Sequence, residues 1–346
     1  MSTGPISFTG PLPTVTSFAE AARAPAQPTL RVTALGGGHG LKATLSALRV
    51  IAAEHLTAIC TVADDGGSSG RIRQDMDVLP PGDLRMALTA LCDDTDWGRT
   101  WAEVMQHRFR SKDGVAGHLD NHAVGNLLIV ALWELLGDPV DGLRWAGALL
   151  GARGQVLPMS RTPLTMSGLV TPDEPGAEPV RIDSQAELAR AGRGGKLTDV
   201  RLHPADAEAC VEAVNAIELS DWVVFGPGSW YTSVLPHLLL EDLRTALQET
   251  EARRCVVMNL KPDTDETWGM SAADHLEVLA HYAPGLNIDA VIADPRSVGE
   301  EEREAFAASA ERLGAEITWA KVRRHDRSDI HDTLRLAIAF NEVFHR

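Results

Sequence analysis

The 346-residue chain carries 32 Lys and Arg against 48 Asp and Glu, which gives a formal net charge of −16 at pH 7. Such an acidic balance argues against a nucleic-acid partner, because affinity for a phosphate backbone comes from clustered positive charge. A nucleotide ligand remains compatible with it, since backbone N–H groups and a few placed cations can hold a single anion.

The sequence also argues against a disulfide-rich, zinc-binding or membrane-spanning protein. The four cysteines lie far apart and form no Cys-x-x-Cys pair. No stretch reaches the ~18 apolar residues that a membrane span needs. The N-terminus lacks the basic and apolar regions of a secretory signal. We therefore expect a cytoplasmic protein without a membrane span.

The first 28 residues are rich in Pro, Ala, Ser and Thr and predict a flexible N-terminal tail. Residues 29–346 are expected to form a single α/β nucleotide-binding domain. It begins with a strand at Leu30–Leu35, a helix at Leu41–Ala53 and a strand at Leu56–Ala63. This series predicts a doubly wound, Rossmann-like parallel sheet covered by helices on both faces.

The middle of the chain interrupts this pattern. Asp83 is expected to cap a helix at Leu84–Cys92, and a longer helix is expected at Ala123–Leu136. Residues 156–203 carry many prolines and glycines between short β-like runs, and they predict a small β-rich insertion. The α/β pattern resumes with a helix at Ala205–Ile217. The elements expected after it are strands at Asp221–Phe225, Arg254–Leu260, Ile288–Ala293 and Ala315–Val322 and helices at Ala272–Tyr282, Glu300–Leu313 and from Asp332.

The first predicted strand ends in a glycine-rich loop that is a candidate anion site. Four glycines in five residues let the backbone approach a ligand and direct N–H groups at it. The alternative is a tight turn that packs the helix on the sheet, and the partial dinucleotide-binding pattern in this loop is weak by itself. The candidate ligand-binding residues are Gly36, Gly37, Gly38, His39 and Gly40.

The second loop follows the second strand and reads Asp-Asp-Gly-Gly-Ser-Ser-Gly-Arg. Ligands of open α/β sheets bind outside the carboxyl ends of the strands, where this loop lies. Asp64 and Asp65 could hold Mg²⁺, the one cofactor that the motifs suggest, or a ribose hydroxyl. The alternative is a solvated turn capped by Asp65. The candidate residues are Asp64, Asp65, Ser68, Ser69 and Arg71.

A third loop follows the strand at Asp221–Phe225, and its hydroxyl groups can donate to phosphate or sugar oxygens. Trp230 or Tyr231 could stack on a base, or either could belong to the core. The candidate residues are Gly226, Pro227, Gly228, Ser229 and Thr232. Further polar contacts are expected from His122 and Asn126 near a helix start and from Asn259 at a strand end.

Together these segments resemble the bacterial gluconeogenesis-factor, or YvcK-like, family, which is related to the 2-phospho-L-lactate transferases of the CofD-like superfamily. The matching stretches stand in the family's order at Leu35–Leu41, Thr61–Arg71, Leu79–Arg85, His118–Leu128, Gly226–Ser233 and Ala273–His275. This chain departs from the family pattern at His39, Asp265 and Ile330. Asp265 would repel a phosphate unless a cation intervenes.

The resemblance implies a regulator that binds UDP-sugars such as UDP-N-acetylglucosamine or UDP-glucose. It implies a role in cell shape and cell-wall precursor supply during gluconeogenic growth, with a protein partner in cell-wall or central metabolism. A homo-oligomer is compatible with the sequence.

Two other functions stay open. A Mg²⁺-dependent transferase similar to 2-phospho-L-lactate transferase would use Asp64 or Asp65 to hold the ion. A nicotinamide dehydrogenase is disfavoured, because a doubled Asp followed by glycines and serines is unusual for a ribose-binding strand end.

Overall fold

The computed structural model describes residues 30–346, except residues 53–54, 112–116, 175, 263 and 328. The predicted N-terminal tail lies outside these described residues. Within them, no helix is long and apolar enough to cross a bilayer.

The core of the molecule is a seven-stranded sheet in which every neighbouring pair of strands is parallel. The strand order is β10-β9-β8-β7-β1-β2-β3, so the chain winds outward from β1 in one direction and from β7 in the other. This confirms the predicted doubly wound fold. The strands are β1 (Val32–Gly36), β2 (Leu56–Cys60), β3 (Gln155–Pro158), β7 (Trp222–Phe225), β8 (Arg253–Val257), β9 (Ala290–Ala293) and β10 (Glu316–Trp319).

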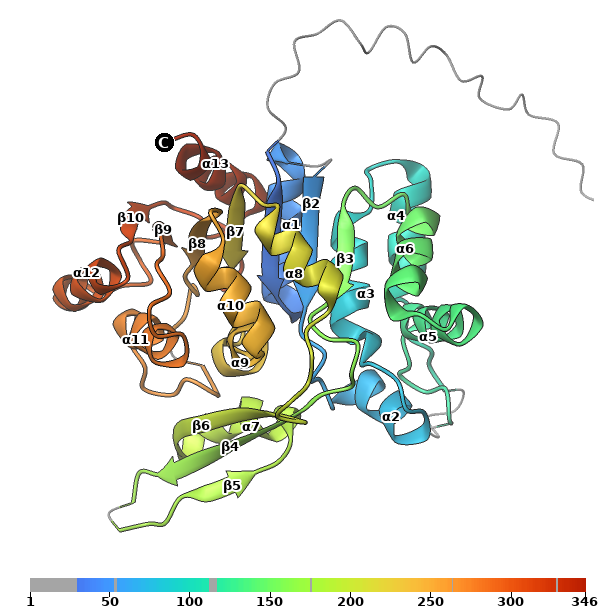
Figure 1. The fold of residues 1–346 in the computed structure, drawn as a ribbon, viewed down its shortest axis with the longest axis horizontal. Coiled ribbons are helices and arrows are strands. Elements are labelled where there is room, and N and C mark those ends of the chain that lie inside the picture. The colour runs from blue at the N-terminus through green and yellow to red at the C-terminus, as the bar shows by residue number, and fades with distance from the viewer. Residues whose placement is uncertain (1–29, 53–54, 112–116, 175, 263, 328) are drawn as a thin grey trace, which may run out of the picture.

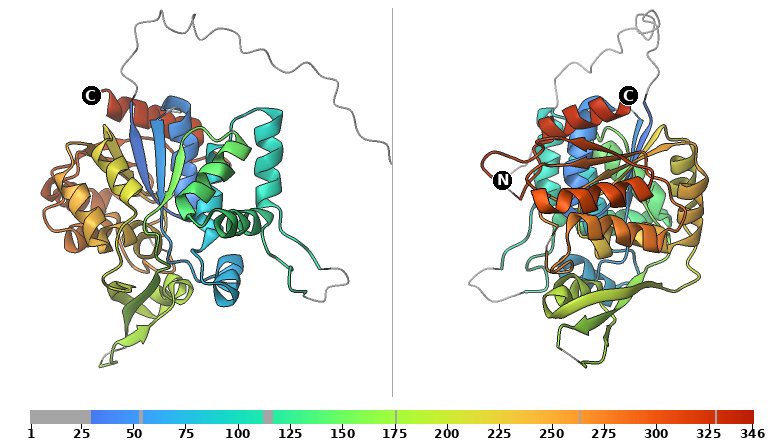
Figure 2. Two further views of the ribbon diagram at one scale, coloured as in Figure 1. Left: turned by 45° about the vertical axis from the view of Figure 1, so that its right-hand side comes forward. Right: turned by 90° about the vertical axis from the view of Figure 1, so that its left-hand side faces the viewer.

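Helices cover both faces of this sheet (Figures 1 and 2). All residues of β1 and β7 are buried, as expected for central parallel strands with helices on each side. On one face α1 packs against α13, and on the other α8 packs against α10. The helices are α1 (Gly38–Ile51), α2 (Gly67–Asp75), α3 (Pro81–Leu91), α4 (Asp96–Gln106), α5 (Val124–Leu136), α6 (Pro139–Leu150), α8 (Val211–Glu218), α9 (Pro236–Leu239), α10 (Glu241–Glu249), α11 (Ala272–Tyr282), α12 (Arg303–Arg312) and α13 (Thr333–Phe344).

A small antiparallel sheet projects beyond the carboxyl ends of the main strands (Figure 1). It consists of β4 (Thr165–Pro172), β5 (Val180–Ile182) and β6 (Gly195–His203), and it carries the short helix α7 (Gln185–Ala191). This is the predicted β-rich insertion. Its predicted start differs, because residues 155–158 pair with β2 in the main sheet. A short apolar run has the same sequence pattern in either sheet.

The structure differs from the sequence expectations at several helices. Asp83 lies inside the first turn of α3 and does not cap it, because the helix already begins at Pro81. Proline suits that first position, where a missing N–H costs nothing. Helices α4 and α6 were not predicted, and α8 begins at Val211 instead of Ala205.

Candidate ligand-binding site

A cleft of about 1170 Å³ opens where the first and third glycine loops meet the ends of the central strands. One wall is formed by α1 and these loops, another by residues 259–261 and 264–266 after β8, and a third by residues 324–326 and 329–334 before and in α13. Ala189 of the insertion completes the lining. The predicted site residues that line the cleft are His39, Gly40, Pro227, Gly228, Ser229 and Asn259.

The first and third loops are held in direct contact by their glycines. A Cβ atom at Gly40 would overlap the backbone carbonyl oxygen of Pro227. The side-chain amide of Asn259, which follows β8, binds Gly228 of the third loop. Its Oδ1 accepts from the Gly228 N–H (2.9 Å), and its Nδ2 donates to the Gly228 carbonyl (2.8 Å). Asn259 therefore joins the wall after β8 to the wall formed by the two glycine loops.

Asp83 supports the first loop from behind, a role that the sequence analysis did not assign. A Cβ atom at Gly37 would overlap the Asp83 carboxylate, which accepts a hydrogen bond from the backbone N–H of Gly38. Burial, and then repulsion from Asp64, raise the pKa of Asp83 to about 7. The sequence signal that could have found it is its place in the family-like stretch at residues 79–85.

The two predicted metal ligands, Asp64 and Asp65, are directed to different places. Asp64 accepts from the Gly66 N–H (2.9 Å) and from the Ser69 hydroxyl, and burial raises its pKa. Both carboxylate oxygens of Asp65 instead accept backbone N–H groups of α7, from Gln185 (3.1 Å) and Ala186 (2.8 Å). The described residues contain no group of three or more His, Cys, Asp or Glu suited to a metal ion.

The serines of the second loop belong to a buried polar network. Ser68 Oγ lies 3.1 Å from His122 Nδ1 and accepts from Asn126 Nδ2 at 3.0 Å, and Asn126 in turn accepts from Arg85 Nε at 2.8 Å. Ser69 Oγ accepts from a backbone N–H of α3. Ser68, Ser69 and Asn126 are all at least 96% buried. They fix α2, α3 and α5 together and do not line the large cleft.

Arg71 and His122 line a second, smaller cleft of about 340 Å³ beside α2. Arg71 donates to the backbone carbonyl of Asp120 at 2.8 Å. Burial, and then the nearby Arg71 charge, lower the pKa of His122. The predicted site residues therefore do not form one site: some line the large cleft, Arg71 and His122 line the small one, and the others bind neighbouring elements or line neither cleft.

Thr232 lies outside the large cleft because it is buried against Glu266. Its hydroxyl donates to Glu266 Oε2 (2.9 Å), while the Tyr231 N–H donates to Oε1 (3.2 Å). Burial raises the pKa of Glu266 to about 7. Trp230 and Tyr231 are 0% and 3% exposed, so neither ring stacks on a ligand in the cleft.

The departures from the family pattern all line the large cleft. His39 is exposed at the start of α1, and Ile330 lies on the opposite wall. The carboxylate of Asp265 forms an ion pair with Arg193 of the insertion, 2.5 Å from its Nε. This guanidinium supplies the cation that offsets the repulsion expected between Asp265 and a phosphate.

His331 adds a polar group that the predicted site did not include. It lines the cleft, and its Nε2 has no hydrogen-bond partner among the described residues. Burial lowers the pKa of His331 to about 4. The ring is therefore neutral at pH 7, and Nε2 can donate a hydrogen bond to a ligand or accept one from it, depending on the tautomer.

A doubly wound sheet with a glycine-walled cleft at its carboxyl edge defines a ligand-binding α/β protein of the Rossmann-like class. The sequence model of one family, described as 2-phospho-L-lactate transferase CofD, matches residues 32–333. The chain belongs to this family, and within it to the gluconeogenesis-factor branch.

Several relatives are similar over most of their length. The chain is 46% identical to a Mycobacterium tuberculosis protein over 313 residues, which cover 90% of each chain. It is 34% identical over 277 residues to a Halalkalibacterium halodurans protein named gluconeogenesis factor, covering 80% of this chain and 81% of that one. A solved UPF0052-family structure from Bacillus halodurans matches with a TM-score of 0.77 and 29% identity, covering 91% of this chain and 99% of the other.

Proposed function

We propose that this chain is a gluconeogenesis factor that binds a UDP-sugar, such as UDP-N-acetylglucosamine or UDP-glucose, in the large cleft. The observation that carries the proposal is the cleft itself, because two glycine loops meet there at the carboxyl edge of the sheet. Ligand pockets commonly measure ~300–1,000 Å³. At about 1170 Å³, this cleft has room for a whole nucleotide sugar.

The lining of the cleft also fits a regulator better than an enzyme. Its polar groups are backbone amides, hydroxyls and scattered charged side chains, which suit hydrogen bonds to a diphosphate and a sugar. The paired carboxylates that could take part in metal-assisted chemistry lie outside this lining. In the proposed role, the cytoplasmic protein reports UDP-sugar levels to a protein partner. This adjusts cell-wall precursor supply and morphogenesis during gluconeogenic growth.

Isothermal titration calorimetry of the full chain tests this function. UDP-N-acetylglucosamine, UDP-glucose, GDP and NAD are each titrated with and without Mg²⁺, and the recovered ligand is checked for turnover. We expect an intact UDP-sugar to bind with the same affinity whether or not Mg²⁺ is present. Absence of binding by both UDP-sugars would contradict the proposal.

A second candidate function is Mg²⁺-dependent transfer of a phospho group, and the pair Asp64–Asp83 favours it. Burial and then repulsion from Asp64 raise the pKa of Asp83, and a divalent cation between the two carboxylates would offset this repulsion. Oxygen ligands of this kind suit Mg²⁺, which would neutralise phosphate charge there. If so, Asp83 takes the place predicted for Asp65. Binding of GDP only with Mg²⁺, or a consumed ligand, would favour this function.

A further inference from the structure

Besides Lys42, two cations of the described residues line the large cleft, Arg324 and Lys261, and each acts on a nearby carboxylate. Arg324 forms two hydrogen bonds with Asp326, at 2.9 and 2.7 Å. Lys261, on the wall after β8, forms no ion pair among the described residues, but its charge acts on Asp329 and helps to lower the pKa of that carboxyl, after the larger effect of Arg327. The charges of Arg324 and Lys261 therefore act on carboxylates near the cleft.

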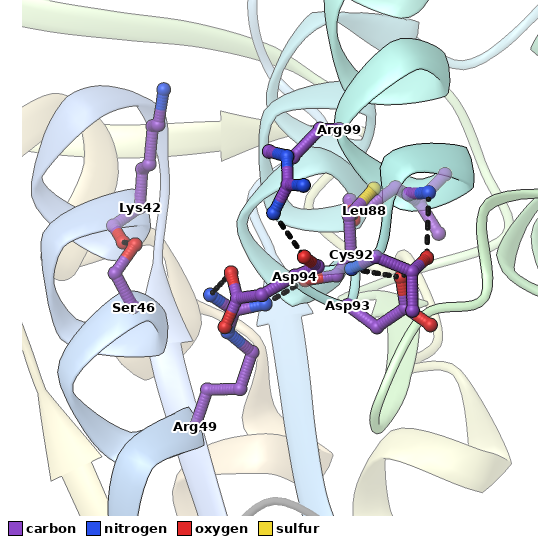
Figure 3. Close-up of polar contacts among 10 residues, drawn as sticks. Lys42, Ser46, Arg49, Leu88, Cys92, Asp93, Asp94 and Arg99 are labelled. Atoms are coloured by element: carbon purple, nitrogen blue, oxygen red, sulfur yellow. Dashed lines mark hydrogen bonds and ion pairs between the residues drawn. The ribbon is translucent and has the colours of Figure 1, made fainter.

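Lys42 differs from them. It lines the cleft from the second turn of α1, one turn after the first glycine loop, and it is half-buried. In the described part of the chain, its ammonium group has no ion-pair or hydrogen-bond partner. Figure 3 shows this group pointing away from the neighbouring polar cluster, with no contact drawn to it.

The rest of this face of α1 shows that free positive charge is not general there. Arg49, two turns further along the helix, donates to the Cys92 carbonyl and forms an ion pair with Asp94 at 2.9 Å (Figure 3). Ser46, between the two cations, donates to the Lys42 carbonyl at 2.8 Å. In a chain with a net charge of −16, Lys42 is thus an uncompensated cation at the cleft wall.

On the opposite wall the uncompensated charge is negative. Asp326 is paired with Arg324 and Asp329 with Arg327, whereas Asp332 forms no ion pair among the described residues and its Oδ1 accepts the Arg335 N–H at the start of α13. Carboxylates attract hydroxyl and N–H donors and repel phosphates. A ligand with an anionic end and a hydroxyl-rich end therefore has a preferred direction in the cleft, with its anionic end at α1.

We propose that Lys42 is the phosphate-binding side chain of the large cleft, and that the ligand lies with its diphosphate at Lys42 and its hydroxyl groups toward Asp332. The identification of the anionic end as the diphosphate of a nucleotide sugar rests on the proposed function. Binding of the phosphate by Lys42 does not depend on that identity. A charge-assisted hydrogen bond between ammonium and phosphate supplies the affinity.

Three variants of the full chain test the proposal. Lys42→Gln keeps most of the side-chain length and removes the charge, whereas Lys42→Arg keeps the charge. Lys321→Gln is the matched control, because this exposed lysine lies outside the cleft lining. Calorimetry gives Kd for UDP-N-acetylglucosamine and for inorganic pyrophosphate, and circular dichroism melts confirm that each variant folds.

We expect Lys42→Gln to weaken both ligands by about tenfold or more. Lys42→Arg and Lys321→Gln should stay within about threefold of wild type. The proposal is overturned if Lys42→Gln binds both ligands as wild type does, or if wild type binds neither. Lys42-dependent binding of pyrophosphate without binding of UDP-N-acetylglucosamine would keep this proposal and reject the proposed function.

Discussion

The stability of Asp83→Asn, measured relative to wild type at the same pH, should rise as the pH is raised. The carboxyl group is buried behind the first glycine loop, and its pKa is raised from 3.8 to about 7. A raised carboxyl pKa favours the folded state only while the group is protonated. The associated stability is complete below pH 3.8 and is lost as the pH rises to about 7. Asn keeps an oxygen that can accept the Gly38 N–H, and it does not titrate.

The size of the effect follows from the shift. Between pH 5 and pH 8, wild type loses the protonated state over about two pH units, which corresponds to ~3 kcal/mol of unfolding free energy. The variant escapes this loss. Groups that do not interact with Asp83 titrate alike in both proteins, so their contributions cancel in the difference. The stability of Asp83→Asn relative to wild type should therefore rise by ~3 kcal/mol between these two pH values.

Urea unfolding at pH 5 and pH 8, followed by circular dichroism, measures this change. Asp96→Asn is the control, because that carboxylate is fully exposed at the start of α4. It should show a change between the two pH values of less than about 0.5 kcal/mol relative to wild type. A stability difference for Asp83→Asn that stays constant from pH 5 to pH 8 would refute the reasoning.

Three further substitutions test other parts of the cleft. Gly40→Ala should destabilise the protein by ~1–3 kcal/mol in thermal unfolding, because the new methyl group would overlap the Pro227 carbonyl. Gly147→Ala in α6 is the control and should not destabilise it, because a methyl group there would lie at ordinary contact distances from its neighbours. Asp65→Ala removes both side-chain acceptors at the start of α7, so amide hydrogen exchange there should speed up about tenfold or more, and unchanged rates would contradict the cap. The lowered pKa of His331 means that the folded state disfavours its protonation, so wild type loses unfolding free energy as the pH falls from 6.5 to 4. His331→Asn should remove up to ~3 kcal/mol of this loss in urea titrations. Equal pH dependence of stability in variant and wild type would contradict this.

Much of the fold was predictable because parallel strands leave clear marks in a sequence. The runs that became β1, β2 and β7 are mostly apolar, since both faces of each strand are covered; β1 ends in Gly36, and Gly226 follows β7 directly. Helix α6 also carried usable signals, with a capping Asp138, a proline at its first position and a left-handed glycine, Gly151, after its end. The prediction rested on hydrophobic runs and made no use of these capping signals.

The site was predictable at the level of loops and less so at the level of side chains. Carboxyl ends of parallel strands meet at one edge, so loops distant in sequence had to converge there. Where a given carboxylate points depends instead on tertiary neighbours. Asp65 turns to α7, about 120 residues further along the chain, and Asp83 turns to the first glycine loop. No local pattern records such pairings, and the same holds for the burial of Thr232 against Glu266.

The insertion lines the cleft with Ala189 and is tied to the main domain by the hydrogen bonds of Asp65 to α7 and by the Arg193–Asp265 ion pair. Binding equilibria at two linked sites obey reciprocity: whatever factor one ligand imposes on the other is returned in full. A protein that bound the projecting sheet and disturbed the Asp65 hydrogen bonds or the Arg193–Asp265 ion pair would change the affinity of the cleft for its ligand. A filled cleft would then change the hold of that protein by the same factor. The projecting sheet is thus a position from which occupancy can be read at a distance, without access to the ligand.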